Sequence, residues 1–257
     1  MNGGLFTRVD GEGDKPWIVL SNSLGSTHRM WDGQMDLLTC KYRVLRYDHR
    51  GHGESAVSEG EVSWSDLIGD VIAIMDDHGI DRADFMGLSM GLMTGLGLGI
   101  HHGGRFGKLV LCDGRADAPD LFQKMWDQRI SAIEAGGIEA IADGALAIWL
   151  SEDWRTANPD RVTELRTMMV TTPAEGYMAC CRCLKTLDYL KDCGDIRNDV
   201  LCITGGKDMG APPDVVKGIA AAIPGARFVE IAGSHHLSNI DGEAAFNAAV
   251  ASFLEIV

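Results

Sequence analysis

Short apolar runs alternate with amphipathic stretches along most of the chain. Runs typical of strands buried on both faces of a sheet lie at residues 17–21, 42–47, 83–86, 108–113, 200–204 and 227–231. Between two of them, Leu67, Val71 and Met75 recur at helical spacing, and a capping-box pair, Ser63 and Asp66, precedes them. This alternation predicts an α/β fold with a mostly parallel central sheet and helices on both faces.

The pattern changes between residues 116 and 190. Strand-like runs vanish there, and Trp, Met and Arg residues gather at helical spacing, as around Trp126, Trp149 and Trp154. We therefore expect residues 116–190 to form a helical cap over a core made of residues 1–115 and 191–257. A chain of 257 residues is long enough for one large α/β domain with such an insertion.

Charge and hydropathy exclude several classes of protein. The formal charge is −14, the acidic residues are scattered, and no basic stripe suited to nucleic acid is present. An anionic substrate would therefore need a local arginine or lysine. The longest apolar run, at residues 85–100, is too short to span a bilayer and is interrupted by Ser89 and Thr94. Its Gly91, Gly95 and Gly99 instead predict a helix packed closely on a sheet.

Cysteine usage and the N-terminus favour a cytoplasmic protein. The seven cysteines are an odd number, and Cys180, Cys181 and Cys183 lack the spacing of a zinc site. Residues 1–6 do not resemble a secretory signal peptide. We expect reduced cysteines, no metal and no cofactor.

One serine stands in a pattern typical of a catalytic nucleophile. Gly87-Leu88-Ser89-Met90-Gly91 is a G-x-S-x-G motif between a predicted strand at 83–86 and a predicted helix at 91–100. A serine in such a turn is held in a strained conformation above the sheet, and the N–H of Met90 at the helix start can stabilise an oxyanion. The alternative is a glycine-rich turn in which Ser89 only caps the helix.

The partners that a nucleophilic serine needs follow later strands, in the chain order Ser, Asp, His. Asp208 follows the run at 200–204, and the adjacent His235 and His236 follow the run at 227–231. Asp208 is thus the candidate acid, with Asp113 as its rival, and one of the two histidines is the candidate base. The loop after residues 17–21 should supply a second oxyanion donor, and Leu24 is the candidate.

Several motifs resemble those of the α/β-hydrolase superfamily and, within it, of the 3-oxoadipate enol-lactonase family. They are Leu20-Ser21-Asn22-Ser23-Leu24-Gly25, Arg46-Tyr47-Asp48-His49-Arg50-Gly51-His52-Gly53, the G-x-S-x-G, Gly176-Tyr177-Met178-Ala179-Cys180-Cys181, and His236-Leu237-Ser238-Asn239-Ile240. The resemblance covers nearly the whole chain. It implies Ser89 as nucleophile, His236 as base and Asp208 as acid, with the Leu24 and Met90 amides as oxyanion donors.

Two departures from that family concern the substrate pocket. Leu92 stands where the family usually has glycine, and we expect it to shrink or reshape the pocket floor. The sequence Ile148-Trp149-Leu150 lacks the arginine of the family's Arg-Trp-Phe. Arg129 could bind a substrate carboxylate instead, with Trp126 and Trp149 as further substrate-binding residues. The alternative is that Arg129, on a helix face of mixed polarity, is exposed to solvent and binds no substrate.

The resemblance predicts a hydrolase that opens a small lactone, 3-oxoadipate enol-lactone before others, through an acyl-enzyme. The alternatives are a carboxylesterase or lactonase for a different ester or ring, and a non-catalytic small-ligand receptor on the same scaffold. The expected partner is a small lactone or ester, with no nucleic acid and no membrane. The sequence leaves open whether the chain forms a homo-oligomer.

Overall fold

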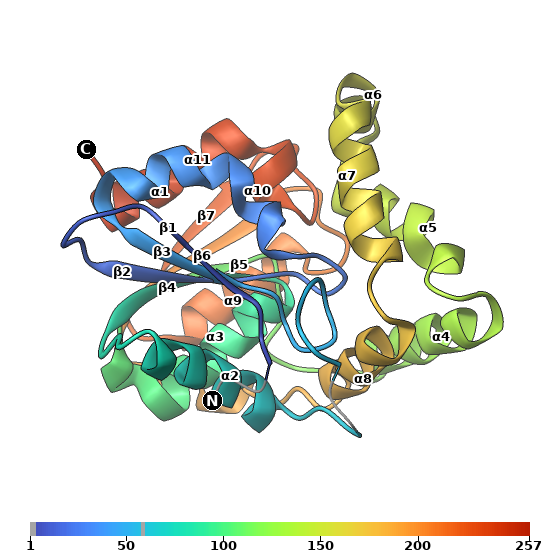
Figure 1. The fold of residues 1–257 in the computed structure, drawn as a ribbon, viewed down its shortest axis with the longest axis horizontal. Helices are drawn as coiled ribbons and strands as arrows, with labels where there is room; N and C mark the ends of the chain where they lie inside the picture. The colour runs from blue at the N-terminus through green and yellow to red at the C-terminus, as the bar shows by residue number, and fades with distance from the viewer. Residues whose placement is uncertain (1–3, 58–59) are drawn as a thin grey trace.

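A seven-stranded sheet runs through the middle of the protein in the order β1-β3-β2-β4-β5-β6-β7 (Figure 1). The structure, a computed structural model, describes residues 4–57 and 60–257. Only β1 runs antiparallel to its neighbour, and every other neighbouring pair is parallel. The strands are β1 (Thr7–Asp10), β2 (Trp17–Ser21), β3 (Arg43–Tyr47), β4 (Ala83–Leu88), β5 (Phe106–Cys112), β6 (Asp199–Gly205) and β7 (Arg227–Ile231).

The predicted strands are confirmed, with boundaries shifted by at most two residues. β2, β4, β5 and β6 are almost wholly buried, as continuous apolar runs in a parallel sheet should be. The edge strand β1 was not predicted, because its four residues are mostly polar and half exposed. Pairing with β3, from Thr7 opposite Tyr47 to Asp10 opposite Val44, makes it a strand.

Helices cover both faces of the sheet, as predicted. α1 (Met35–Lys41) and α11 (Glu243–Leu254) lie on one face, and α2 (Trp64–Asp77), α3 (Met90–His102) and α9 (Pro213–Ala222) lie on the other (Figure 1). The expected capping box is present, since the N–H of Asp66 donates to Ser63 Oγ at 3.2 Å and the N–H of Ser63 donates to Asp66 Oδ2 at 2.9 Å. Shorter elements are α10 (Ser238–Asp241) and the 3₁₀ helices η1 (His28–Gln34), η2 (Gly103–Arg105) and η3 (Leu190–Asp195).

The glycines of α3 let this helix pack closely against the sheet, as expected. A Cβ at position 91 would lie 2.2 Å from the main-chain oxygen of Ser21, and one at position 95 would lie 2.6 Å from the side chains of Phe85 and Leu111. Among the described residues, no helix is long and apolar enough to cross a bilayer. Residues 1–3, part of the segment in which no signal peptide is predicted, lie outside the described residues.

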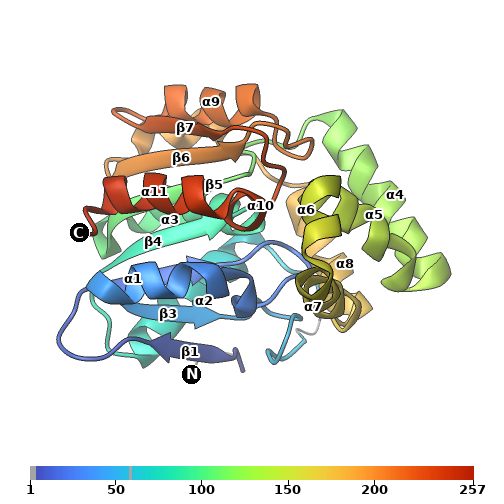
Figure 2. The same ribbon diagram turned by 90° about the horizontal axis from the view of Figure 1, so that it is seen from above.

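The helices between β5 and β6 form a layer beyond the carboxyl ends of the strands, which we call the cap (Figure 2). They are α4 (Asp120–Gly136), α5 (Glu139–Trp149), α6 (Glu152–Ala157), α7 (Pro159–Val170) and α8 (Ala174–Leu184). The cap meets the core backbone to backbone where Gly176 of α8 lies against Gly51, because a Cβ on either residue would come within 2.6 Å of the other's backbone. A second contact joins the end of α5 to the core, where the N–H of Leu237 donates to Trp149 O at 2.9 Å.

Candidate active site

Ser89 occupies the sharp turn between β4 and α3. Its backbone has φ 59° and ψ −112°, a conformation that L-residues rarely adopt, and its N–H donates to Cys112 O at 2.8 Å. A Cβ at position 87 would lie 2.2 Å from Gly91 O, so the turn depends on the glycines that flank the serine. The serine is half-buried and lines a cavity beneath the cap.

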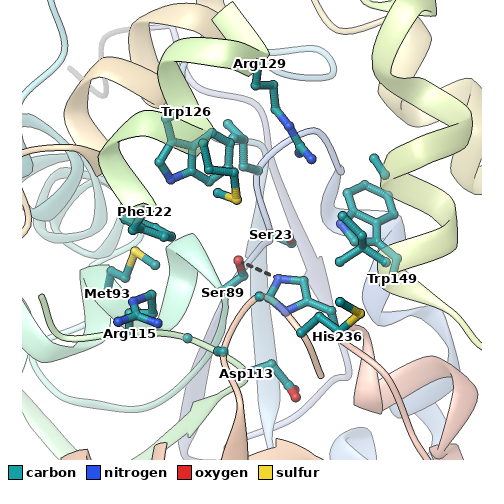
Figure 3. Close-up of a pocket in the computed structure, with 18 of the residues that line it drawn as sticks. Ser23, Ser89, Met93, Asp113, Arg115, Phe122, Trp126, Arg129, Trp149 and His236 are labelled. Atoms are coloured by element: carbon teal, nitrogen blue, oxygen red, sulfur yellow. Dashed lines mark hydrogen bonds between the residues drawn. The ribbon is translucent and has the colours of Figure 1, made fainter. Parts of the chain in front are cut away.

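A continuous hydrogen-bonded line connects Ser89 to a carboxylate. His236 Nε2 lies 2.9 Å from Ser89 Oγ, and His236 Nδ1 lies 2.8 Å from Asp208 Oδ2 (Figure 3). The other oxygen of Asp208 accepts the N–H groups of Gly210 at 2.7 Å and Ala211 at 3.1 Å. A carboxylate held in this way keeps the proton on Nδ1, and Nε2 is then free to take the serine proton.

The two rivals from the sequence take other partners. Asp113 Oδ1 accepts the N–H of Gly205 at 2.7 Å, and its Oδ2 accepts the hydroxyl of Ser238 at 2.5 Å. Burial, and next the charge of Asp208, raise the pKa of Asp113 well above its usual value. His235 lies against Asp241, with its Nδ1 3.4 Å from a carboxylate oxygen. The structure thus joins His236 and Asp208, not His235 and Asp113, to Ser89.

The two amides expected to stabilise an oxyanion have no hydrogen-bond partner in the part of the chain that the structure describes. Met90 is the first residue of α3, where main-chain N–H groups lack intrahelical acceptors and the helix dipole is positive. Leu24 follows β2, the neighbour of β4, in a loop held by Asn22 Nδ2, which donates to Tyr47 O at 2.6 Å. The side chain of Leu24 lines the cavity, whereas that of Met90 is buried elsewhere.

The cavity above Ser89 measures about 230 Å³ and lies between the cap and the strand ends. Figure 3 shows Trp126 and Arg129 of the cap above the serine and Trp149 beside His236. All three predicted substrate-binding residues therefore line it. Arg129 Nη1 donates to the hydroxyl of Tyr177 at 3.2 Å, and its guanidinium carbon lies 5.2 Å from the centre of the Trp126 ring. Among the described residues, no carboxylate pairs with Arg129.

Of the two departures from the family pattern, one reaches the cavity. Ile148 lines it. Leu92 does not line the cavity itself, although its neighbour Gly114 does, so the expectation that it shrinks or reshapes the pocket floor stays a prediction. The helical turn after Ser89 directs Leu92 toward the end of β5, where it packs on Gly114. A Cβ at position 114 would lie 2.9 Å from Leu92 Cβ.

Among the cavity residues that sequence reasoning missed are Met93, Arg115, Phe122 and Tyr177. Tyr177 stands in one of the family motifs but received no role. Arg115 carries the most chemistry, and a signal for it existed, because it comes three residues after the end of β5 and the carboxyl ends of strands are where functional groups gather.

Comparison with known proteins gives the family. A family model described as alpha/beta hydrolase fold matches residues 16–243. The chain belongs to this α/β-hydrolase family. It is 32% identical to 3-oxoadipate enol-lactonase 1 of Acinetobacter baylyi over 98% of this chain and 94% of that protein. The α/β-hydrolase fold and the family resemblance expected from the sequence are thereby confirmed.

Other members of the α/β-hydrolase family give a more varied picture. The crystal structure of an enol-lactonase from Burkholderia xenovorans LB400 superposes with a TM-score of 0.94 at 38% identity, over 98% of this chain and 96% of that chain. A putative carbamate hydrolase, RutD of Caulobacter segnis, is 30% identical over 93% of this chain and 91% of that protein. The enol-lactonases agree with the expectation of a carboxylic ester hydrolase.

Proposed function

We propose that the protein is a serine hydrolase that opens small lactones, 3-oxoadipate enol-lactone before others. The observation that carries the proposal is the hydrogen-bonded line Ser89–His236–Asp208 at the base of a largely apolar cavity beneath the cap. Two relatives named as enol-lactonases support the substrate. Arg129 gives the cavity a cation for the carboxylate of such a lactone.

In the first half of the reaction, His236 Nε2 takes the proton of Ser89, and Ser89 Oγ adds to the lactone carbonyl. The N–H groups of Leu24 and Met90 stabilise the resulting oxyanion, while Asp208 stabilises the imidazolium. The ring C–O bond then breaks, and His236 returns the proton to the departing enol oxygen. The enol remains attached to the acyl group and tautomerises to the ketone.

In the second half, water loses a proton to His236 and adds to the acyl-enzyme carbonyl. Ser89 Oγ leaves and regains its proton from His236, which frees the carboxylic acid. Arg129 holds the substrate carboxylate throughout, and Trp126 and Trp149 pack against the remaining apolar surface. No step requires a group beyond these side chains, the two amides and water.

The test is hydrolysis of 3-oxoadipate enol-lactone by the pure protein, followed by the loss of ultraviolet absorbance. Ser89→Ala and His236→Ala should each lower kcat by about four to six orders of magnitude, as in other triads. His78→Ala, an exposed histidine away from the cavity, should stay within about twofold of the parent enzyme. Turnover of either triad variant within about tenfold of the parent would contradict the assignment.

Two further substrates separate the competing functions. Cleavage of 4-nitrophenyl acetate through Ser89 without cleavage of the lactone would make the protein a carboxylesterase or a lactonase for another ring. Hydrolysis of a small carbamate alone would place it beside the relatives named as putative carbamate hydrolases. Tight binding of the lactone without turnover of any substrate would indicate a receptor.

A further inference from the structure

A second arginine reaches the cavity from the core, whereas Arg129 belongs to the cap. Arg115 follows β5, lines the cavity, and has a side chain that is only 15% exposed. Its position is fixed on both sides. Before it, Gly114 packs against the serine turn, where a Cβ would lie 3.0 Å from Ser89 O. After it, Ala116 O accepts the N–H of Tyr189 at 2.8 Å and of Leu190 at 2.9 Å.

Aromatic rings connect the two arginines along one cavity wall. The guanidinium carbon of Arg115 lies 5.2 Å from the centre of the Phe122 ring. The rings of Phe122 and Trp126 pack edge to face, with their centres 5.7 Å apart. The guanidinium of Arg129 in turn lies over the ring of Trp126. Phe122, Trp126 and Arg129 share one face of α4 because they are four and three residues apart. In Figure 3, Arg115 and Arg129 lie on opposite sides of Ser89, with the two rings between them.

Neither guanidinium is well compensated by the protein. Arg115 Nη2 donates to the carboxylate of Asp117 and Arg115 Nε donates to the main-chain oxygen of Asp117, both at 3.4 Å, and Asp117 is 40% exposed, so these contacts are long and the ion pair is screened by solvent. Arg129 donates to the neutral hydroxyl of Tyr177. The remaining carboxyl at this wall, Asp113, is already engaged by Gly205 and Ser238. The chain has a net charge of −14, yet two arginines without a close carboxylate partner line this one small apolar cavity. The cavity is therefore locally positive in a negatively charged protein.

We propose that this cavity takes lactones or esters that carry two carboxylates, one bound by Arg129 and the other by Arg115. Planar guanidinium groups bind carboxylates through paired hydrogen bonds, and the apolar wall between the two arginines strengthens both ion pairs. The inference widens the proposed substrate class, because 3-oxoadipate enol-lactone has one free carboxylate, and it rests on the proposed function for placing the reacting carbonyl at Ser89. It makes Arg115 a specificity-determining residue.

Binding measurements test the second carboxylate subsite without relying on turnover. Linear dicarboxylates of about four to eight carbons are titrated into the protein by calorimetry, beside monocarboxylates of equal length. The best dicarboxylate should bind about 10- to 100-fold more tightly than its monocarboxylate counterpart. Arg115→Gln should abolish this preference, and Arg115→Lys, which keeps the charge, should restore part of it. Arg166→Gln, a cap arginine paired with Glu139 and Asp143 outside the cavity, should leave the preference unchanged.

Equal binding of mono- and dicarboxylates, or a preference that survives Arg115→Gln, would overturn the inference. Hydrolysis of neutral 4-nitrophenyl acetate by the same preparations separates this failure from that of the proposed function. If the ester is cleaved through Ser89 while no dicarboxylate preference is found, only the Arg115 subsite is wrong. If the ester and the lactone both survive while dicarboxylates bind through Arg115, the proposed hydrolase activity is wrong and the subsite stands.

Discussion

The strained backbone of Ser89 allows a prediction about stability that is independent of catalysis. A residue with a side chain at φ 59° and ψ −112° costs on the order of 1–3 kcal/mol. Ser89→Gly removes this cost, although greater freedom of the unfolded chain takes back about 0.4–1 kcal/mol. Ser89→Ala keeps a Cβ and therefore keeps the strain. Both variants lose the hydrogen bond to His236, so their difference reports the backbone alone. We expect Ser89→Gly to be more stable than Ser89→Ala by about 1 kcal/mol.

Thermal unfolding followed by calorimetry measures this difference directly. For a chain of this size, about 1 kcal/mol corresponds to a Tm higher by about 2–4 °C for Ser89→Gly than for Ser89→Ala. The control is an alanine-to-glycine substitution inside an ordinary helix. Ala248→Gly, at an exposed position inside α11, should lower stability by about 1 kcal/mol. A Tm for Ser89→Gly equal to or below that of Ser89→Ala would refute the claim that the turn stores strain.

Two further predictions concern the acid of the site and the response to pH. Asp208→Asn should lower kcat for the lactone by about three to four orders of magnitude. Asp113→Asn should lower kcat by less than about tenfold, because asparagine still accepts the N–H of Gly205. The reverse order in steady-state kinetics would make Asp113 the acid. Burial lowers the pKa of His49 to about 3, so the unfolded chain, in which histidine titrates near 6.5, binds more protons in acid. The contribution of His49 to stability should therefore be fully present above about pH 6.5 and be lost as the pH falls below that value. His49→Gln should flatten this loss in urea unfolding at pH 7.5 and 5, and equal pH dependence in both proteins would contradict it.

Much of the fold could be predicted because buried parallel strands are continuous apolar runs. The run at residues 17–21 became β2 without any shift, and the glycines at 91, 95 and 99 signalled the close approach of α3. β1 could not be predicted, since its four residues gain strand structure only from pairing with β3. In the cap, helical spacing was visible, but the bounds of α4 to α8 depend on which faces meet the core, and that is a tertiary property.

The site shows the same division. Chain order placed Ser89, Asp208 and His236 at strand ends, but it could not decide between Asp208 and Asp113, which both follow strands of the sheet. The decision lies in side-chain direction, because Asp113 turns toward Gly205 and Ser238. Arg115 was missed for a related reason. Its place after β5 was a signal, but the sequence does not show that the packing of Leu92 on Gly114 leaves the next residue at the cavity wall.

The contact between Gly51 and Gly176 has a consequence for how this protein can diversify. Neither position has room for a methyl group, and each is closed off by the backbone of the other, so no substitution at one can be offset by a change at the other. Gly176 immediately precedes Tyr177, the residue to which Arg129 donates its hydrogen bond. The α8 end of the cap is therefore closed to substitution at this contact. Within the cap, new specificities would have to arise through α4 to α7, where side chains can be exchanged without disturbing it.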